Sequence, residues 1–396
     1  MSLNSKAALA AGIATMCIIT GTAAIAQSGN TPEARYVMDV GTIGGFMGQG
    51  GSHELTLRLG SRLPASGAPK ADHFMPQGAR LGASVPLESP TRSTGSDYAG
   101  QFQRPKGRLL LYWGCGAKAG PGQPVVIDFA KLAKGQMPPN LFSSKVPMED
   151  GPTPENSRSY GTWPNGMSGK NISPQSSVLG QHRVAGNYSP EIAFGLDQDF
   201  MAGLKVRASD NGDGSTALGW NGLGNATGYY AWAMGGKDMG ENKGGDMVWW
   251  TSSASQEFGG GLWSWLSPGT VNRLIGQKVV MPTTQTSCTV PAEVRQIAGE
   301  HMMGFVYAYG PEANFAFPAR PANPKTPWKP EWTAKVRYRS IANFMTGMPD
   351  MSGMGAMNGG DYDADDEERP TRPRQKPCKP KLGGMLRGAL TGGSAC

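Results

Sequence analysis

The stretch Leu204–Met234, LKVRASDNGDGSTALGWNGLGNATGYYAWAM, decides the fold class of this chain. It contains three short apolar runs, LKVRA (204–208), TALGW (216–220) and YYAWAM (229–234), separated by segments rich in Gly and Asn. Short runs with aromatic or β-branched residues between such segments are typical of strands joined by turns. The DNGDG sequence at 210–214 favours a hairpin-type turn. The stretch therefore predicts consecutive β-strands.

The same pattern continues on both sides of this stretch. Further strands are predicted at 36–43, 53–59, 108–113, 125–129, 247–251, 302–309 and 333–340. Two short helices are predicted, one from Ser267-Pro268 to Ile275 and one from Pro291 to Glu300, the first because Ser followed by Pro is a helix-start signal. The 58 Gly and 31 Pro of the 396 residues disfavour long helices. We therefore expect a mostly β protein with two β-sandwich-like domains and short helical insertions.

Composition divides the chain into five parts. We expect a signal peptide at 1–26, an N-terminal β-rich domain at 27–149, a Pro- and Ser-rich linker at 150–183 and a C-terminal β-sandwich-like domain at 184–346. A disordered charged tail is expected at 347–396, because six acidic residues between Asp361 and Glu368 are followed by seven basic ones. Residues 60–106 lack periodicity and predict a long loop with a few short strands.

The N-terminus has the three zones of a secretion signal. Lys6 precedes the apolar segment 7–19, and Ala24-Ile25-Ala26 is a small-x-small cleavage site before Gln27. This pattern predicts export to the periplasm, the outer-membrane surface or the extracellular space. The alternatives are an uncleaved membrane anchor and a lipid attached to Cys17. No later stretch is long and apolar enough to predict a transmembrane helix.

Four cysteines follow the predicted signal: Cys115, Cys288, Cys378 and Cys396. In an oxidising compartment they allow two disulfides with three connectivities. A local loop between Cys378 and Cys396 would leave Cys115 to pair with Cys288. The sequence has no CxxC spacing, so we expect no zinc site or other metal site.

Residues 204–235 resemble half of a fibronectin type III-like sandwich. The resemblance is carried by Ala217-Leu218-Gly219-Trp220 and by Gly228-Tyr229-Tyr230-Ala231-Trp232, joined by the loop 221–227. It implies that Trp220 fills the space between two sheets, and that Tyr230 and Trp232 pack from the facing sheet. It covers under a tenth of the chain, and it implies a spacer or binding module without catalytic residues.

The sequence predicts a non-catalytic protein without a cofactor. It contains no GxSxG, HExxH or P-loop motif. The four histidines, His53, His73, His182 and His301, are isolated in sequence, and we expect structural roles for them. A secreted hydrolase with paired carboxylates is one alternative, but sequence does not place any two acids across a cleft.

Two groups of residues are candidates for ligand binding. Lys335, Arg337 and Arg339 alternate along one predicted strand, so they share a face, and Trp328 and Trp332 lie just before them. This pattern predicts either a strip that contacts an anionic envelope glycan or a solvated strand face that blocks edge-to-edge aggregation. The second group would serve a carbohydrate-binding module, with Trp249, Trp250, Trp263 and Trp265 as sugar platforms; Trp249 and Trp250 point to opposite sheet faces, so we expect one of them to be exposed or in a second interface.

The function expected from the sequence is therefore a non-catalytic structural or binding protein of the cell envelope or the secreted medium. The expected partner is an envelope glycan or another envelope protein. Nucleic acid is not expected in that compartment, and the sequence does not indicate an oligomeric state.

Overall fold

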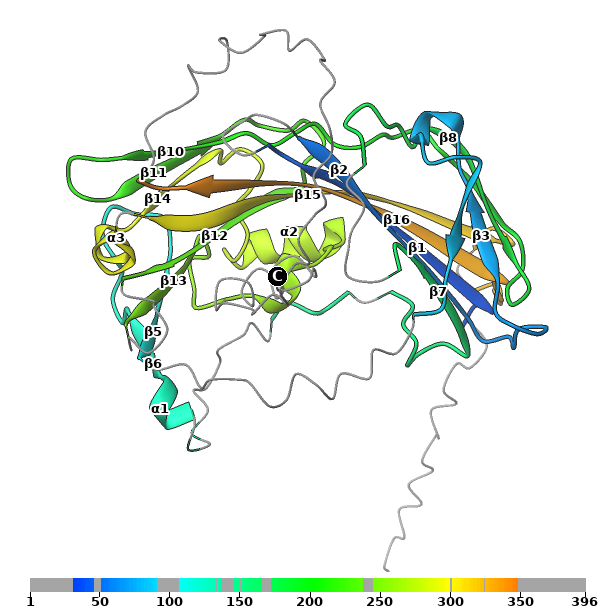
Figure 1. Cartoon of the computed structure of the whole chain (residues 1–396), viewed down its shortest axis with the longest axis horizontal. Helices are drawn as coiled ribbons and strands as arrows, with labels where there is room; N and C mark the ends of the chain where they lie inside the picture. The colour runs from blue at the N-terminus through cyan, green and yellow to red at the C-terminus, as the bar shows by residue number, and fades with distance from the viewer. Residues whose placement is uncertain are drawn as a thin grey trace, which may run out of the picture.

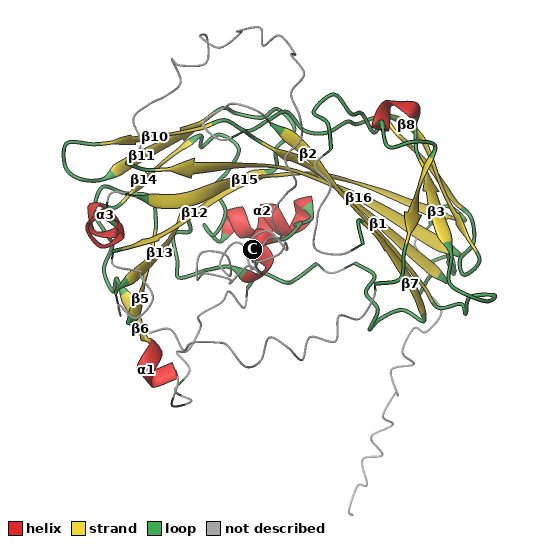
Figure 2. Ribbon diagram, viewed as in Figure 1, coloured by secondary structure: helices red, strands yellow, loops and turns green. Residues whose placement is uncertain are grey.

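The protein is built mainly from β-strands, as the sequence predicts. A computed structural model describes residues 31–45, 51–90, 107–132, 134, 136, 145–149, 151–165, 172–237, 245–299, 301–323 and 325–347. Strands account for 43% and helices for 10% of the structure, which confirms the mostly β class with short helical insertions. Figure 2 shows that strands in several sheets make up most of the structure and that the helices are few and short.

The centre of the molecule is one large, strongly curved sheet of nine strands (Figure 1). In order across the sheet they are β6 (Val125–Asp128), β5 (Arg108–Trp113), β13 (Met247–Thr251), β12 (Gly228–Gly236), β15 (Met302–Phe317), β16 (Trp332–Met345), β1 (Ala34–Ile43), β2 (Ser52–Ser61) and β7 (Ser159–Trp163). Most neighbours are antiparallel, but β1 pairs with β16, and β5 with β13, in parallel. These parallel pairs join segments that are far apart in sequence.

Two smaller sheets cover the convex side of the large sheet (Figure 1). One has the order β10 (Val206–Asp210), β11 (Thr216–Trp220), β14 (Ser287–Val290). The other has the order β4 (Ser84–Leu87), β3 (Ala71–Phe74), β8 (Gly180–Gly186), β9 (Ile192–Leu196). The main core lies between these sheets and the convex face, where Leu55, Leu57 and Leu59 of β2 are buried as their alternation predicts.

A second core fills the concave side, where a helix packs against the sheet (Figure 1). This helix is α2 (Pro268–Gly276), and the 3₁₀ turn Gly260–Trp263 precedes it. Ser267 caps α2 by accepting a hydrogen bond from the backbone N–H of Thr270, as the Ser-Pro signal predicts. The other helices are α1 (Phe129–Leu132), the turn Gln77–Ala79, and α3 (Ala292–Ala298), which confirms the helix expected after Pro291.

The predicted N- and C-terminal domains do not form separate sheets. Strands from 27–149 and from 184–346 lie side by side in the nine-stranded sheet, and β7, from the predicted linker 150–183, forms its edge. The range 60–106 contains β3 and β4, in agreement with the few short strands expected there. The physical reason for the shared sheet is that β1 and β5 each find a parallel partner from the second half of the chain.

Cys115 and Cys288 form a disulfide, which ties the loop after β5 to β14 of the three-stranded sheet. The pairing agrees with the connectivity favoured from the sequence. Cys378 and Cys396 lie outside the described residues, as do the predicted signal 1–26 and, beyond Gly347, the predicted tail.

The segment with the fibronectin-like resemblance forms strands in two facing layers. Trp220 of β11 is buried between them and packs on Tyr229 of β12, with ring centroids 5.6 Å apart. The expectation that Tyr230 and Trp232 face Trp220 is wrong: the residues of β12 that face Trp220 are the ones immediately before them, Tyr229 and Ala231. Both side chains point to the concave core instead, because Tyr229 and Ala231 occupy the face toward the small sheet.

Candidate functional site

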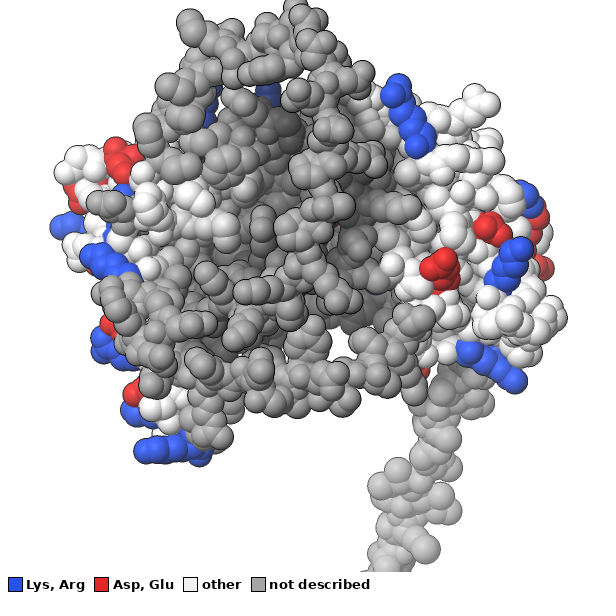
Figure 3. Space-filling model, viewed as in Figure 1, with Lys and Arg blue, Asp and Glu red and all other residues white. Residues whose placement is uncertain are grey.

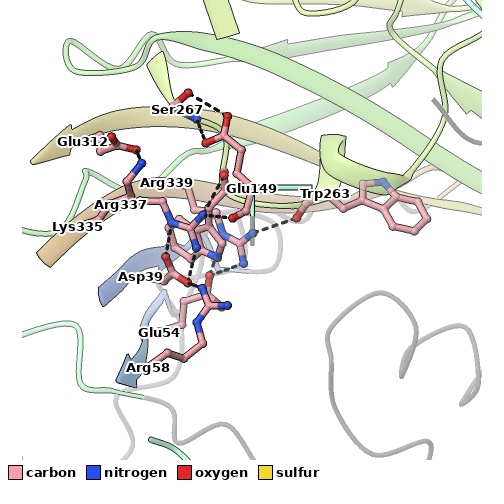
Figure 4. A network of polar contacts seen from close by, with 11 residues as sticks. Asp39, Glu54, Arg58, Glu149, Trp263, Ser267, Glu312, Lys335, Arg337 and Arg339 are labelled. Atoms are coloured by element: carbon pink, nitrogen blue, oxygen red, sulfur yellow. Dashed lines mark hydrogen bonds and ion pairs between the residues drawn. The ribbon is translucent and has the colours of Figure 1, made fainter. Parts of the chain in front are cut away.

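The predicted cationic strip lies on the concave face of the large sheet and forms a network of ion pairs (Figure 4). Arg337 on β16 lies directly across from Asp39 on the parallel strand β1. Its Nε and Nη2 atoms donate to the two oxygens of the Asp39 carboxylate at 2.6 and 2.9 Å. Arg58 of β2 donates to the same carboxylate from the other side at 2.6 Å. Asp39 and Arg337 are 2% and 3% exposed, so this is a buried bidentate pair with a second guanidinium beside it.

Arg339 forms a second ion pair, whose partner lies on β2, on the far side of β1. Glu54 of β2 reaches over Gly41 of β1 and accepts bonds from Arg339 at 2.8 and 3.0 Å. A Cβ at position 41 would lie 2.3 Å from the Glu54 side chain, so the close approach requires glycine here. Burial by itself would lower the pKa of Arg339, but Glu54 and Tyr307 outweigh it, and the pKa is raised.

Both arginines also hold the segment before α2 on the sheet. Arg337 donates to the carbonyls of Glu149 and Trp265, and Arg339 donates to the carbonyl of Trp263 at 3.1 Å. The Arg339 guanidinium lies 4.0 Å from the centre of the Trp265 ring, within the range of a cation–π contact. Four residues from the two predicted ligand-binding groups, Trp263, Trp265, Arg337 and Arg339, therefore contact each other, but the two guanidiniums are hydrogen-bonded to the protein itself.

Glu149 extends this network to the N-terminus of α2. Its carboxylate accepts bonds from the backbone N–H and the hydroxyl of Ser267, both at 2.9 Å, and from the hydroxyl of Thr270 at 2.5 Å. A carboxylate at a helix N-terminus is favourable because it meets unpaired N–H groups and the positive end of the helix dipole. The network thus joins β1, β2, β16, the 145–149 segment and α2.

Lys335, Arg337 and Arg339 share a face of β16, as predicted. The alternative interpretation, in which this whole face is solvated, is wrong. Arg337 is buried and Arg339 is half-buried, since α2 and its preceding segment cover them. Lys335 is the most open of the three, with 38% of its side chain exposed and its ammonium 3.0 Å from Glu312.

The predicted tryptophan platforms are largely internal. Trp249 and Trp250 point to opposite faces of β13, as alternation requires, and they are 5% and 0% exposed. Trp263 stacks on Trp249 with centroids 5.4 Å apart, and it is half-buried, like Trp265. Of the two alternatives expected for the Trp249–Trp250 pair, an exposed ring or a second interface, the structure shows the second: Trp249 lies in the concave core and Trp250 in the main core, because the sheet is covered on both sides.

Aromatic and cationic side chains instead gather in an open groove at the end of the β15–β16 hairpin. The groove has a volume of about 900 Å³. It is lined by Ala193, Asn314, Phe315, Ala316, Phe317, Ala319, Arg320, Trp328, Trp332, Thr333, Ala334 and Lys335. Among these lining residues two are cationic and none is acidic.

The aromatic rings of the groove are fixed by the chain around them. Phe317 is 52% exposed and stacks on the buried Trp332, with centroids 6.3 Å apart and planes 20° apart. Trp328 is half-buried, and its indole N–H donates to the carbonyl of Pro318 at 2.9 Å, which fixes the orientation of the ring. Arg320 lies 5.6 Å from the centre of the Trp328 ring. Arg320, Trp328 and Trp332 belong to the basic, aromatic-rich segment 320–339 that stands out in the sequence, whereas Phe317 lies before it and joins them only through the hairpin.

A buried chain of polar side chains behind the groove was missed entirely. The hydroxyl of Tyr36 is 2.6 Å from His73 Nδ1, His73 Nε2 is 3.0 Å from His182 Nδ1, and His182 Nε2 is 2.7 Å from the carbonyl of Val178. Since that carbonyl only accepts, the bonds are satisfied when both imidazoles are neutral and protonated on Nε2. Burial lowers the pKa of both histidines, well below the usual value for His73.

The histidine pair connects to the groove through stacked rings. His182 stacks on Phe194 with centroids 5.2 Å apart, and Phe194 stacks on Phe315, a groove residue, at 5.0 Å. The sequence offered no sign of this chain, because its two histidines are 109 residues apart. The expected structural role agrees with their burial.

Charges of both signs are interspersed on the flanks of the molecule that Figure 3 shows. Within the described ranges, no three or more His, Cys, Asp or Glu side chains are grouped so that they could hold a metal ion. No helix in the described part of the chain has the length and apolar character needed to cross a membrane.

Comparison with known proteins gives no relative from which a role could be carried over. No protein-family model matches the chain, and no curated protein matches it.

Proposed function

We propose that this chain is a non-catalytic, exported binding protein of the cell envelope or the secreted medium, and that the hairpin groove is its ligand site. The observation that carries the proposal is the exposed ring of Phe317 beside Trp328 and Arg320 in an open groove. Exposed aromatic surface next to a cation is costly to leave in water and is characteristic of recognition surfaces.

The other polar residues singled out above support a scaffold role. Arg337 and Arg339 are committed to Asp39, Glu54 and backbone carbonyls, so they fix α2 on the sheet. The Cys115–Cys288 disulfide is compatible with an oxidising compartment, which the N-terminal signal pattern also favours. Carbohydrate is the ligand class that the groove favours among those considered from the sequence.

Cell fractionation and envelope binding test this proposal. We expect the full-length chain, expressed in a bacterial host, to be recovered outside the cytosol with Gln27 as its first residue by mass spectrometry. We expect the purified mature protein to co-sediment with isolated cell envelopes, and the Phe317→Ser/Trp328→Ala variant to do so much less. Arg207→Gln, an exposed change on β10, is the control. Retention in the cytosol with Met1 attached, or equal sedimentation of all variants, would refute the proposal.

A further inference from the structure

We infer that the hairpin groove takes an acidic polysaccharide, with a pyranose ring stacked on the aromatic surface and its anionic group directed to Arg320. The inference rests on the proposed function, since it names the ligand class of the same groove.

The aromatic surface suits a flat partner with one apolar face. Phe317 and Trp332 are nearly parallel, and Trp328 is fixed by its bond to Pro318. The C–H bonds on one face of a pyranose ring are apolar, whereas its hydroxyl groups point outward at the rim. Such a ring can cover an aromatic face and remain hydrated at its edge, which an open groove allows.

The charge of the groove favours an anion. Arg320 is exposed, and among the described residues its charged group has the Trp328 ring as its contact and no carboxylate partner. Lys335 is already paired with Glu312, so Arg320 is the cation that an incoming ligand can use. A planar guanidinium binds a carboxylate, sulfate or phosphate through two parallel hydrogen bonds.

The loop that carries Arg320 and Trp328 is stiff and basic. Proline recurs at every third position from Pro318 to Pro330, and Arg320, Lys325 and Lys329 stand in this loop against the single acid Glu331. The ends of the loop are closed by the bond from the Glu331 N–H to the Phe317 carbonyl at 2.7 Å, and a turn forms where Thr326 N–H donates to Asn323. Fixed proline φ angles lower the entropy lost when a ligand orders such a loop.

Two matched polymers test the inference on the full mature chain. In polygalacturonate whose carboxyl groups have been reduced, a neutral primary alcohol replaces each carboxylate and the pyranose ring is unchanged. Titration calorimetry at low and moderate salt measures the affinity for each polymer. We expect the acidic polymer to bind at least about tenfold more tightly than the reduced one, and added salt to weaken the acidic polymer alone.

Three variants assign the effect to residues. We expect Arg320→Gln to weaken binding of the acidic polymer about tenfold and to leave the reduced polymer unaffected. Trp328→Ala should weaken binding of both polymers, whereas Arg207→Gln should change neither. Thermal unfolding of each variant checks that the fold is kept, and Trp328→Phe serves if Trp328→Ala unfolds.

The outcomes separate this inference from the proposed function. Equal affinity for both polymers, or an Arg320→Gln variant that binds like the unchanged protein, would overturn the acidic-ligand inference. The proposed function would still stand if the protein is exported and sediments with envelopes through Phe317 and Trp328. Binding of polyglutamate as tightly as polygalacturonate would also overturn the inference, because it would show recognition of charge without the sugar ring.

Discussion

Replacing Asp39 by Asn should destabilise the protein by about 3–5 kcal/mol. The substitution keeps the size of the side chain but removes the carboxylate charge. Two guanidiniums bind this carboxylate: nitrogen atoms of Arg337 lie 2.6 and 2.9 Å from its oxygens, and a nitrogen of Arg58 lies at 2.6 Å. Two unit charges 4 Å apart at an effective dielectric constant of about 20 attract by roughly 4 kcal/mol. Side-chain exposures of 4% for Arg337 and 2% for Asp39 mean that water cannot replace this attraction.

The matched control is Glu191→Gln, which removes a carboxylate from an exposed ion pair. Arg183 and Glu191 have side-chain exposures of 44% and 58%, so we expect a cost below about 1 kcal/mol. Urea unfolding followed by tryptophan fluorescence at pH 7.5 gives the free energy of unfolding of each variant.

The double variant Asp39→Leu/Arg337→Met separates the ion pair from its surroundings. Since apolar residues of similar size replace a buried pair at little cost, we expect the double variant to be at least about 2 kcal/mol more stable than the summed losses of the single variants Asp39→Leu and Arg337→Met predict. The double variant should still be less stable than the unchanged protein, because Arg337 also binds the carbonyls of Glu149 and Trp265. If Asp39→Asn costs no more than Glu191→Gln, or if the single losses add, the pair does not act as a buried unit.

Because burial lowers the pKa of His73 and His182, the unfolded chain binds more protons than the folded chain below pH 6.5. The free energy of unfolding should therefore fall on acidification from pH 7 to 5, by up to about 1.4 kcal/mol per pH unit per histidine. Urea titrations should show a smaller pH slope for His73→Gln, and a slope unaffected by His73→Gln would contradict the assignment. The Cys115–Cys288 disulfide links residues 173 positions apart and so restricts the unfolded chain. If this loss of unfolded-state entropy is the whole effect, Cys115→Ser/Cys288→Ser should lower the free energy of unfolding by about 5 kcal/mol at most. An unchanged urea midpoint would contradict a native disulfide. Gly41→Val should displace Glu54 from Arg339 and increase proteolysis of the segment before α2. Gly219→Ala, where a Cβ meets open space, should leave the proteolysis unchanged. Equal digestion of the two variants would show that the Glu54–Arg339 ion pair over Gly41 does not hold this segment.

Local structure was predictable wherever a short-range pattern decides it. The strand 108–113 has the predicted bounds, the Ser267-Pro268 signal starts α2, and the period-two leucines of β2 face the main core. β9 was missed although Ile192, Phe194 and Leu196 alternate, because the alternation extends over a run of only five residues.

The rest depends on contacts between distant residues. Arg337 was identified as part of a one-sided strip, but its partner Asp39 is 298 residues away, so sequence could not tell a buried pair from a binding strip. His73 and His182 appeared isolated for the same reason. The groove was partly predictable, because Arg320, Trp328 and Trp332 stand in one basic, aromatic-rich segment of the sequence; Phe317 joins them only when β15 and β16 form a hairpin.

The position of β1 in the large sheet affects the order in which the chain can fold. One of its two edges is bonded to β2 nearby in the chain, but the other must wait for β16, the last strand described. Until residue 345 has been synthesised, the middle of the large sheet has an open seam with exposed N–H and C=O groups. A chain truncated before β16 should therefore be prone to intermolecular strand pairing, and folding should be slow and late relative to synthesis.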